Sequence, residues 1–457
     1  MSFMDRFYLL DNDYAGRLNE EIEDLEIYDP HTHADVEEIV ENEGWGDIWE
    51  VEAETDHYVW ELMRKRGVDE QFITGSASNR EKWFALADVF PEFAGNPTYE
   101  WIHLDLKRRF GIDKVISSKT AEEVWEETKA KLKQDSFRPQ QLLNEMNVET
   151  LCSTDDPTME LEFHERAPEE VEGTTILPTW RPDKFMKIET ESWKDAVKEL
   201  GRETGEDVSS FRGFLDGLEA THRYFDDMGC LASDHGVERG VTRQVKRTRA
   251  AEIYKKGFEK QEKLTQEELT DFRSFLLIFF GKLNRQTDWV TQLHVGAVRN
   301  YREELYHELG PDSGGDVGTS DVNFTSNLKH FLNTFDGDME IVLYYLDPSH
   351  LASVATLARA FPNVSVGAPW WFNDSPHGIE EQLEYVGTVD LLANHAGMVS
   401  DSRKLMSYGS RIEVFRRSLA NVIGKMVEKG QVPEESARDL VKTVVLSRKK
   451  ELFGFGS

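Results

Sequence analysis

Residues 25–33 read LEIYDPHTH, a short apolar, strand-forming run that ends in two histidines separated by one residue. Side chains two positions apart in a strand point to the same face, so His31 and His33 are expected to project together from the end of this strand. The run is the first of a series along the chain, and this series decides the fold class.

Seven more apolar, β-rich runs that end in polar residues follow it, at residues 148–157, 174–183, 229–235, 289–296, 339–347, 363–372 and 389–401. Segments with helical periodicity, such as residues 194–221 and 266–284, separate most of these runs. The repeated strand–helix alternation predicts an α/β protein with a parallel sheet, most economically a (β/α)8 barrel of the TIM type. An open doubly wound sheet is the alternative, but the glycine-rich phosphate turn of that fold is missing after the first run.

The first two predicted strands are separated by residues 36–145, far more chain than one crossover helix needs. Trp-, Glu- and Lys-rich patterns in this stretch, as in residues 121–132, predict helices. We therefore divide the chain into three parts. Residues 1–35 hold the N-terminal segment and first strand, residues 36–145 an inserted, mainly helical subdomain, and residues 146–457 the rest of the barrel with C-terminal helices.

A second irregular stretch, residues 300–327, follows the fifth predicted strand and contains the sequence GPDSGGDVGTSD. Such a loop is commonly a plain surface excursion. Its position beyond the carboxyl end of a strand makes a lid or a substrate-contacting loop the alternative.

The chain carries 86 Asp and Glu against 53 Lys and Arg, a net charge of −33 spread along its length. This excess repels nucleic acids and anionic membranes, so neither is an expected partner. The dispersal fits either a solvated surface or adaptation to a cytoplasm with high salt, and the second interpretation is favoured. The acid-rich helical insertion also offers a surface for homo-oligomer formation, which high salt would promote.

Only Cys152 and Cys230 are present, so no disulfide framework is predicted and a reducing cytoplasm is the expected compartment. The N-terminus carries acids where a signal peptide would be basic. No stretch approaches the roughly 20 apolar residues that a membrane helix needs.

His31 and His33 are the first candidates for metal binding, because a barrel's reactive end lies at the carboxyl ends of its strands. In a closed barrel the eighth strand pairs with the first, which brings Asp401 within reach of both imidazoles. Two imidazoles and a carboxylate leave positions open on a divalent cation, as a catalytic site requires. The alternatives are a pair of buried, hydrogen-bonded histidines, and a helix N-cap at Asp401.

Three arginines, Arg181, Arg299 and Arg403, stand beside strand ends in this otherwise acidic chain. Singly, each is more typical of a surface ion pair. Together they indicate an acidic substrate, because a guanidinium fork matches a carboxylate in two places. Trp370 ends the seventh strand, where it fits either rim packing or contact with the apolar side of a sugar.

Several longer stretches resemble the uronate (glucuronate) isomerase family of the amidohydrolase superfamily. The resemblance covers almost the whole chain and is carried by DPHTHAD, DHYVWELMRKRGV, NPTYEWIHLDLKRRFGI, STDDP, LPTWRPDKF, GCLASDHG, QLHVGAVRN, WWFND and MVSDSRKLMSYGSRIEVFRR. It implies a (β/α)8 barrel that interconverts D-glucuronate with D-fructuronate and D-galacturonate with D-tagaturonate.

The resemblance also implies a site. It gives His31, His33 and Asp401 as ligands of a divalent metal, commonly Zn²⁺. The predicted catalytic residues are Asp401, Tyr58, His57 and His294, and the predicted substrate-binding residues are Arg181, Arg299, Arg403, Trp370 and Asp234. The fourth strand ends in Asp234-His235 without the lysine that hydrolases of the superfamily often use, which favours the isomerase.

An aldose–ketose exchange moves a proton between C2 and C1. A carboxylate or phenolate can carry it, so our hypothesis gives Asp401 this role, with Tyr58 or His57 assisting at the oxygen. Hydride transfer between the same carbons stays open. The rival functions are a metal-dependent hydrolase on the same barrel and a non-catalytic sugar-acid binding protein.

Overall fold

The computed structural model describes residues 3–260 and 262–456. Its parallel strands form two sheets. One contains β1 (Ile27–Asp29), β2 (Val148–Cys152) and β3 (Thr175–Leu177), and the other contains β4 (Ala232–Val237), β5 (Val290–Val295), β8 (Ile341–Tyr345) and β9 (Val364–Val366). Each strand overlaps one of the first seven runs predicted above, and β4 extends two residues past its run, so these strands are confirmed.

Residues just beyond β3 join the two sheets. Trp180 forms parallel bridges with Asp155 on one side and with Ser233 of β4 on the other. The strands therefore follow one another in space in the order of the chain, from β1 to β9. This order, with helices between the strands, is that of an α/β barrel.

The predicted eighth strand, residues 389–401, is wrong as a regular strand. Helix α19 (Pro376–Val389) ends where the strand was expected to begin, and a short 3₁₀ helix, η6 (Leu392–Asn394), follows. Positive φ angles of 79° at Gly397 and 47° at Asp401 interrupt an extended chain. The His395 ring also accepts a bond from the Gly397 amide, a local bond that competes with sheet pairing.

The same segment nevertheless bridges the gap between β9 and β1. The Ala396 amide donates to the Val366 carbonyl at 3.0 Å. On the other side, the Asp401 amide donates to the His31 carbonyl at 3.2 Å, and the His33 amide to the Ser402 carbonyl at 3.0 Å. Asp401 therefore lies beside His31 and His33, as the barrel prediction required.

Residues 36–145 contain helices and no strand among the described residues. Their buried tryptophans, Trp49, Trp83, Trp101 and Trp125, belong to the same apolar core as the strands β1, β2 and β8. The proposed division at residues 35 and 145 stays a prediction. The α-helices of this stretch are α2 (Val36–Glu41), α3 (Ile48–Glu52), α4 (His57–Lys65), α5 (Asn79–Val89), α6 (Pro97–Arg108), α7 (Ala121–Leu132) and α8 (Pro139–Glu145).

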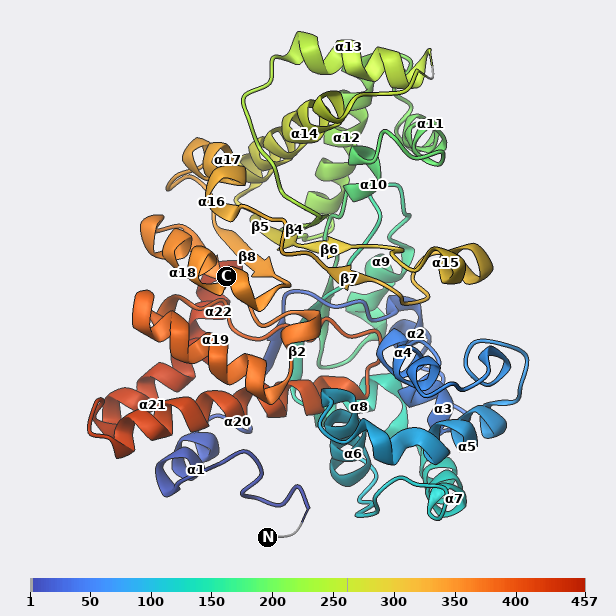
Figure 1. Cartoon of the computed structure of the whole chain (residues 1–457), viewed down its shortest axis with the longest axis vertical. Coiled ribbons are helices and arrows are strands. Elements are labelled where there is room, and N and C mark those ends of the chain that lie inside the picture. Colours follow the sequence, from blue (N-terminus) through green and yellow to red (C-terminus); the bar gives the residue numbers. More distant parts are fainter. Residues whose placement is uncertain (1–2, 261, 457) are drawn as a thin grey trace.

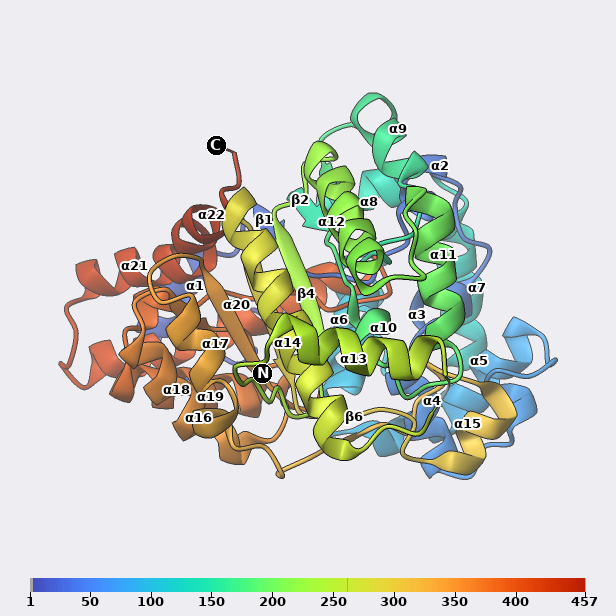
Figure 2. The same cartoon turned by 90° about the horizontal axis from the view of Figure 1, so that it is seen from above.

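A second apolar core lies under the helices around β4 and β5, where Trp180, Trp193 and Tyr254 are buried. Figures 1 and 2 both show α11 to α14 gathered on this side of the molecule. The α-helices from β2 to β5 are α9 (Glu162–Glu170), α10 (Asp183–Met186), α11 (Trp193–Thr204), α12 (Phe211–Asp227), α13 (Arg247–Phe258) and α14 (Gln266–Thr287).

The glycine-rich segment after β5 forms a small hairpin at the carboxyl ends of the strands. Two-residue strands β6 (Ala297–Val298) and β7 (Val317–Gly318) pair antiparallel, and α15 (Glu303–Leu309) lies between them. In Figure 1 this hairpin and α15 extend over the strand ends toward α4.

The C-terminal part of the chain is helical and packs against the N-terminal helix. The 22-residue helix α20 (Ser407–Glu428) is mostly buried and packs against α1 (Asp13–Glu20), so helices from the first and last parts of the chain lie side by side (Figure 1). No helix in the described part of the chain is long and apolar enough to cross a membrane. The remaining α-helices are α16 (Phe324–Asn327), α17 (Lys329–Thr334), α18 (Leu351–Ala360), α21 (Glu434–Lys442) and α22 (Arg448–Phe453).

Candidate active site

A cavity of about 390 Å³ opens at the carboxyl ends of the strands. Most of the predicted site residues line it together: His31, His33, His57, Tyr58, Arg181, His294, Arg299, Trp370, Asp401 and Arg403. They come from opposite ends of the chain and from the helical insertion. These residues therefore lie around one cavity at the carboxyl ends of the strands, where the active site of an α/β barrel is expected.

His31, His33 and Asp401 form a compact group of metal-ligating atoms. Asp401 Oδ1 lies 3.0 Å from His31 Nε2 and 3.3 Å from His33 Nε2. Burial lowers the pKa of His33 to about 4, so its imidazole is neutral at pH 7, the form that binds a metal ion. Burial opposes ionisation of Asp401, but hydrogen bonds from both histidines hold its pKa well below the usual range. This donor set fits a divalent cation.

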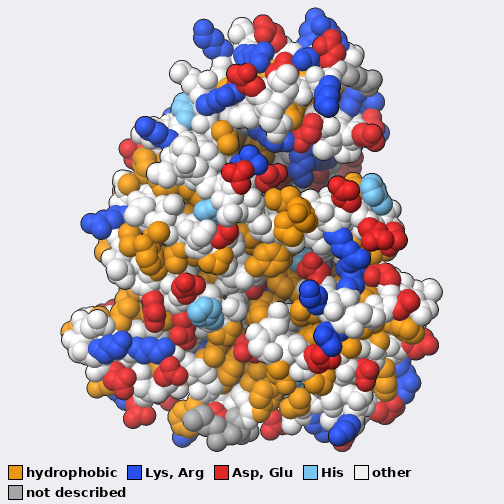
Figure 3. Space-filling model, viewed as in Figure 1, with side chains coloured by type: hydrophobic (Ala, Val, Ile, Leu, Met, Phe, Trp, Pro, Cys, Tyr) orange, Lys and Arg blue, Asp and Glu red, His pale blue; other side chains and the backbone are white. Residues whose placement is uncertain are grey.

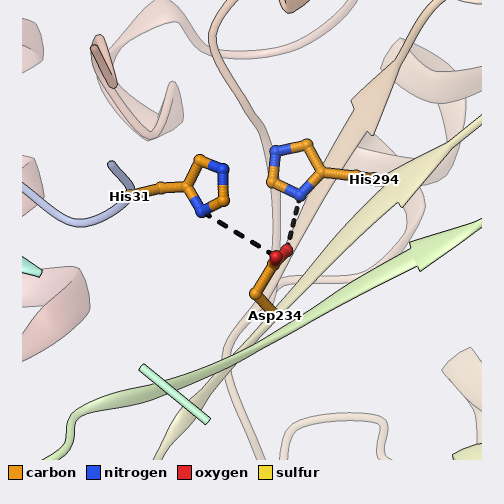
Figure 4. Close-up of side chains that lie close together, drawn as sticks. All are labelled: His31, Asp234 and His294. Carbon is orange, nitrogen blue, oxygen red and sulfur yellow. Dashed lines mark hydrogen bonds and ion pairs between the residues drawn. The ribbon is translucent and has the colours of Figure 1, made fainter. Parts of the chain in front are cut away.

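Asp234 lies between His31 and His294 and contacts both rings, as Figure 4 shows. Its Oδ1 accepts a 2.6 Å bond from His294 Nδ1, and its Oδ2 lies 3.9 Å from His31 Nδ1. Its side chain is fully buried and is not part of the cavity lining. The geometry therefore favours a positioning role for Asp234, and its predicted contact with substrate stays a prediction.

The three arginines differ in how firmly the protein holds them. Arg181 is paired with Asp183 at 3.1 Å and with Asp234 at 3.1 Å. Arg299 is paired with Asp316 of the β6–β7 hairpin at 2.9 Å and lies 4.4 Å from the Trp371 ring. Arg403 has one ion pair among the described residues, at 3.3 Å with the exposed Asp312.

Two residues that line the cavity, Trp371 and Asp401, have a strained backbone. Trp371 has a φ of 53° and Asp401 a φ of 47°, in the left-handed region that side chains rarely adopt. The Trp371 ring stacks on His57 with centroids 5.4 Å apart and planes 6° from parallel. Trp370 lies edge-on to His294 at 4.7 Å. Trp371 and Trp370 therefore hold the rings of His57 and His294 in place at the side of the cavity.

His57 and Tyr58 begin helix α4, which carries them to the cavity. The Asp56 carboxylate caps this helix by accepting a 2.9 Å bond from the Tyr58 amide. Burial lowers the pKa of His57 to about 4, assisted by Arg403, so His57 is neutral at pH 7. Burial also raises the pKa of Tyr58 well above its usual value, so Tyr58 is a phenol. Both side chains can therefore act as neutral hydrogen-bonding groups.

Sequence reasoning missed several charged residues that surround these two side chains. The Lys404 ammonium lies 3.0 Å from Asp56 and 3.3 Å from Glu52. Asp374 accepts hydrogen bonds from Tyr58 and Arg411. A weak signal was available, since Asp374 ends the WWFND stretch and Lys404 lies three residues after Asp401.

A parallel α/β barrel with such a cavity at its strand ends defines a barrel enzyme. The model of the glucuronate isomerase family matches residues 1–453. The chain belongs to this family and is an isomerase, as its resemblance predicted.

Similar proteins agree over the full length. The uronate isomerase of Thermotoga maritima is 57% identical over 451 residues, covering 99% of each chain. The crystal structure of the T. maritima uronate isomerase superposes with a TM-score of 0.97, covering 99% of this chain and 100% of that one. The glucuronate isomerase of Caulobacter crescentus superposes with a TM-score of 0.95 at 26% identity, covering 100% and 98%. These full-length matches to isomerases do not favour the hydrolase alternative.

Proposed function

We propose that this enzyme interconverts D-glucuronate with D-fructuronate and D-galacturonate with D-tagaturonate by proton transfer between C2 and C1. The observation that carries the proposal is the convergence of three kinds of group on one cavity. It has a His–His–Asp cluster, arginines that suit a carboxylate, and hydrogen-bonding groups for sugar oxygens. Family membership agrees with it.

His31, His33 and Asp401 would hold a divalent metal ion, and we propose Zn²⁺ because it favours imidazole and carboxylate ligands. When bound, the ion polarises a carbonyl and stabilises negative charge that develops on the sugar oxygens.

The arginines select the acid sugar. Arg403 is the best candidate for two-point contact with the C6 carboxylate, because one exposed aspartate at 3.3 Å is its only ion-pair partner among the described residues. Arg299, paired with Asp316, supports the same end of the substrate. Arg181 instead neutralises the buried Asp234. Trp370 offers its apolar surface to the sugar.

Asp401 acts as the base. Its pKa is held low, so it is a carboxylate at pH 7 and can take the proton from C2 and return it to C1. Tyr58 and neutral His57 assist at the oxygens, where one hydroxyl loses a proton and the former carbonyl gains one. His294, held by Asp234, completes the wall.

Arg403→Met tests the carboxylate assignment. Purified, metal-loaded enzyme should turn over both uronates, and the variant should keep its metal while KM for each uronate rises by about 10- to 100-fold, the effect of losing a charged hydrogen bond. Arg181→Met is the comparison and should mainly lower kcat. A KM that is unchanged in R403M would assign the carboxylate to another residue. Wild-type enzyme that releases a product heavier by one water would restore the hydrolase.

A further inference from the structure

Asp374 stands in the buried wall behind Tyr58, just after the 3₁₀ helix η5 (Trp371–Asn373) that follows β9. The Tyr58 hydroxyl donates to Asp374 Oδ2 at 3.3 Å, and an Arg411 Nη donates to the same oxygen at 3.1 Å. Asp374 is 4% exposed, and its other oxygen, Oδ1, has no hydrogen-bond partner among the described residues. One oxygen of this carboxyl group is thus bonded twice, while the other is left open.

Arginine and aspartate pair most strongly in a two-point fork, and Arg411 does not form one with Asp374. Arg411 contacts other groups besides Asp374. It lies 3.9 Å from the centre of the Trp101 ring and also donates to the Ser400 carbonyl at 3.3 Å. Arg411 therefore holds Asp374 in place without saturating it. The arrangement leaves the carboxyl group able to exchange a proton with Tyr58.

We propose that Tyr58 and Asp374 form a two-residue proton relay that leads from a substrate oxygen in the cavity into its buried wall. This inference rests on the proposed function, because an aldose–ketose exchange requires one hydroxyl oxygen to lose a proton while another oxygen gains one. Tyr58 lines the cavity and touches Asp374, so it joins the two ends of the path.

The charges around the pair suit such a relay. Burial raises the pKa of the Asp374 carboxyl to about 7, and Arg411 of α20 opposes that rise while the nearby Asp401 adds to it. Burial raises the pKa of Tyr58 well above its usual value. The carboxyl group thus changes charge easily near neutral pH, whereas the phenol does not release its proton alone.

The proton exchange is therefore concerted. The O–H bond of a sugar hydroxyl breaks as its proton passes to the Tyr58 oxygen, and the Tyr58 proton passes in the same step to the Asp374 carboxylate. The reverse movement delivers a proton to the former carbonyl oxygen. Atoms and charges balance within the substrate and these two residues, with no oxidant or reductant.

A double-mutant cycle on the metal-loaded enzyme tests the relay through kcat. Asp374→Asn and Tyr58→Phe should each lower kcat by about 100-fold with little change in KM, as loss of a proton-transfer group does. The double variant should lose no more than either single one, because both remove the same path. Asp374→Glu should restore part of the activity. Asp271→Asn, which removes a buried carboxylate paired with Arg243 and Arg249 away from the cavity, is the matched control and should keep wild-type kinetics.

A second readout does not need turnover. In protein labelled with ¹³C at the tyrosine ζ-carbons, the Tyr58 signal is the one that Y58F removes. It should shift with pH around about 7 as Asp374 titrates, and this shift should vanish in D374N but persist in D271N. A Tyr58 signal with the same pH dependence in D374N, additive losses of kcat, or wild-type kcat in D374N would each overturn the relay. Wild-type enzyme inactive on both uronates would refute the proposed function, and the NMR result would still decide whether the two residues exchange a proton.

Discussion

The His31 ring lies between two carboxylates, those of Asp401 and Asp234. One ring nitrogen faces Asp401 at 3.0 Å in the cavity, and the other faces the buried Asp234 at 3.9 Å. A metal-binding histidine commonly donates its second ring N–H to a carboxylate. This bond fixes the orientation of the ring and increases the basicity of the nitrogen that binds the metal.

His31→Ala should therefore reduce bound metal by more than about tenfold, at least as much as the loss of an outer partner would. Metal content measured by mass spectrometry after dialysis checks this. His307→Ala on the exposed face of α15 is the control and should bind as wild type. Full metal content in H31A would remove His31 from the ligand set.

Asp155 gives a prediction about pH. Burial raises the pKa of its carboxyl to about 7, although Ser153 and the Thr179 amide donate hydrogen bonds to it. Between about pH 4 and pH 7 the folded protein holds this proton and the unfolded chain does not, so the contribution of Asp155 to the free energy of unfolding falls as pH rises, by at most about 1.4 kcal/mol per pH unit. Asp155→Asn removes this dependence, and its free energy of unfolding should gain on wild type from pH 5 to pH 7.

Urea unfolding at pH 5, 6, 7 and 8 measures the difference. It should level off above about pH 7, where both states of wild type are ionised. The exposed Asp336→Asn is the control and should follow wild type at each pH. A difference between D155N and wild type that does not change with pH would contradict the assignment.

At the scale of elements, Lys404 joins the helical insertion to the strand-end segment before α20. It is buried with Glu52 at the end of α3 and with Asp56, the cap of α4. Lys404→Met should lower the free energy of unfolding by about 3–5 kcal/mol, because both carboxylates lose their buried partner. It should also lower kcat, since α4 presents His57 and Tyr58.

Urea unfolding and steady-state kinetics check this prediction. Lys425→Met, which removes a more exposed lysine paired with Asp11 and Glu380, is the matched control and should cost less than about 1 kcal/mol. An equal decrease in the free energy of unfolding of the two variants would show that the buried Lys404 ion pairs stabilise the fold no more than the more exposed ones of Lys425.

Periodicity and strand-end chemistry predicted the barrel strands and brought His31, His33 and Asp401 together. The eighth strand could not be predicted correctly, because residues 389–401 look apolar and strand-like while positive φ angles at Gly397 and Asp401 break the ladder. The buried partners were missed for a different reason. Asp374, Lys404 and Arg411 are ordinary charged residues in sequence, and only the packing of distant elements brings them to Tyr58 and Asp56.

At the scale of the whole molecule, the net charge of −33 acts on every element. Acidic and basic side chains are both scattered over the face shown in Figure 3, so repulsion is spread over the surface. The melting temperature should therefore rise as KCl increases and level off near 1 M, where the Debye length is about 3 Å. A melting temperature that is independent of KCl would contradict adaptation to high salt. Homo-oligomer formation stays a prediction, and light scattering in the same series tests it.

The most direct test of the proposed isomerisation is an NMR time course of D-glucuronate with metal-loaded enzyme in D₂O and high-salt buffer. We expect D-fructuronate to appear without addition of water, with solvent deuterium at C1, and to stop appearing once a chelator removes the metal. Product that keeps all of its hydrogen from C2 would support hydride transfer or a base that is fully shielded from solvent. No ketouronate from folded, metal-loaded enzyme with either uronate would contradict the proposed function.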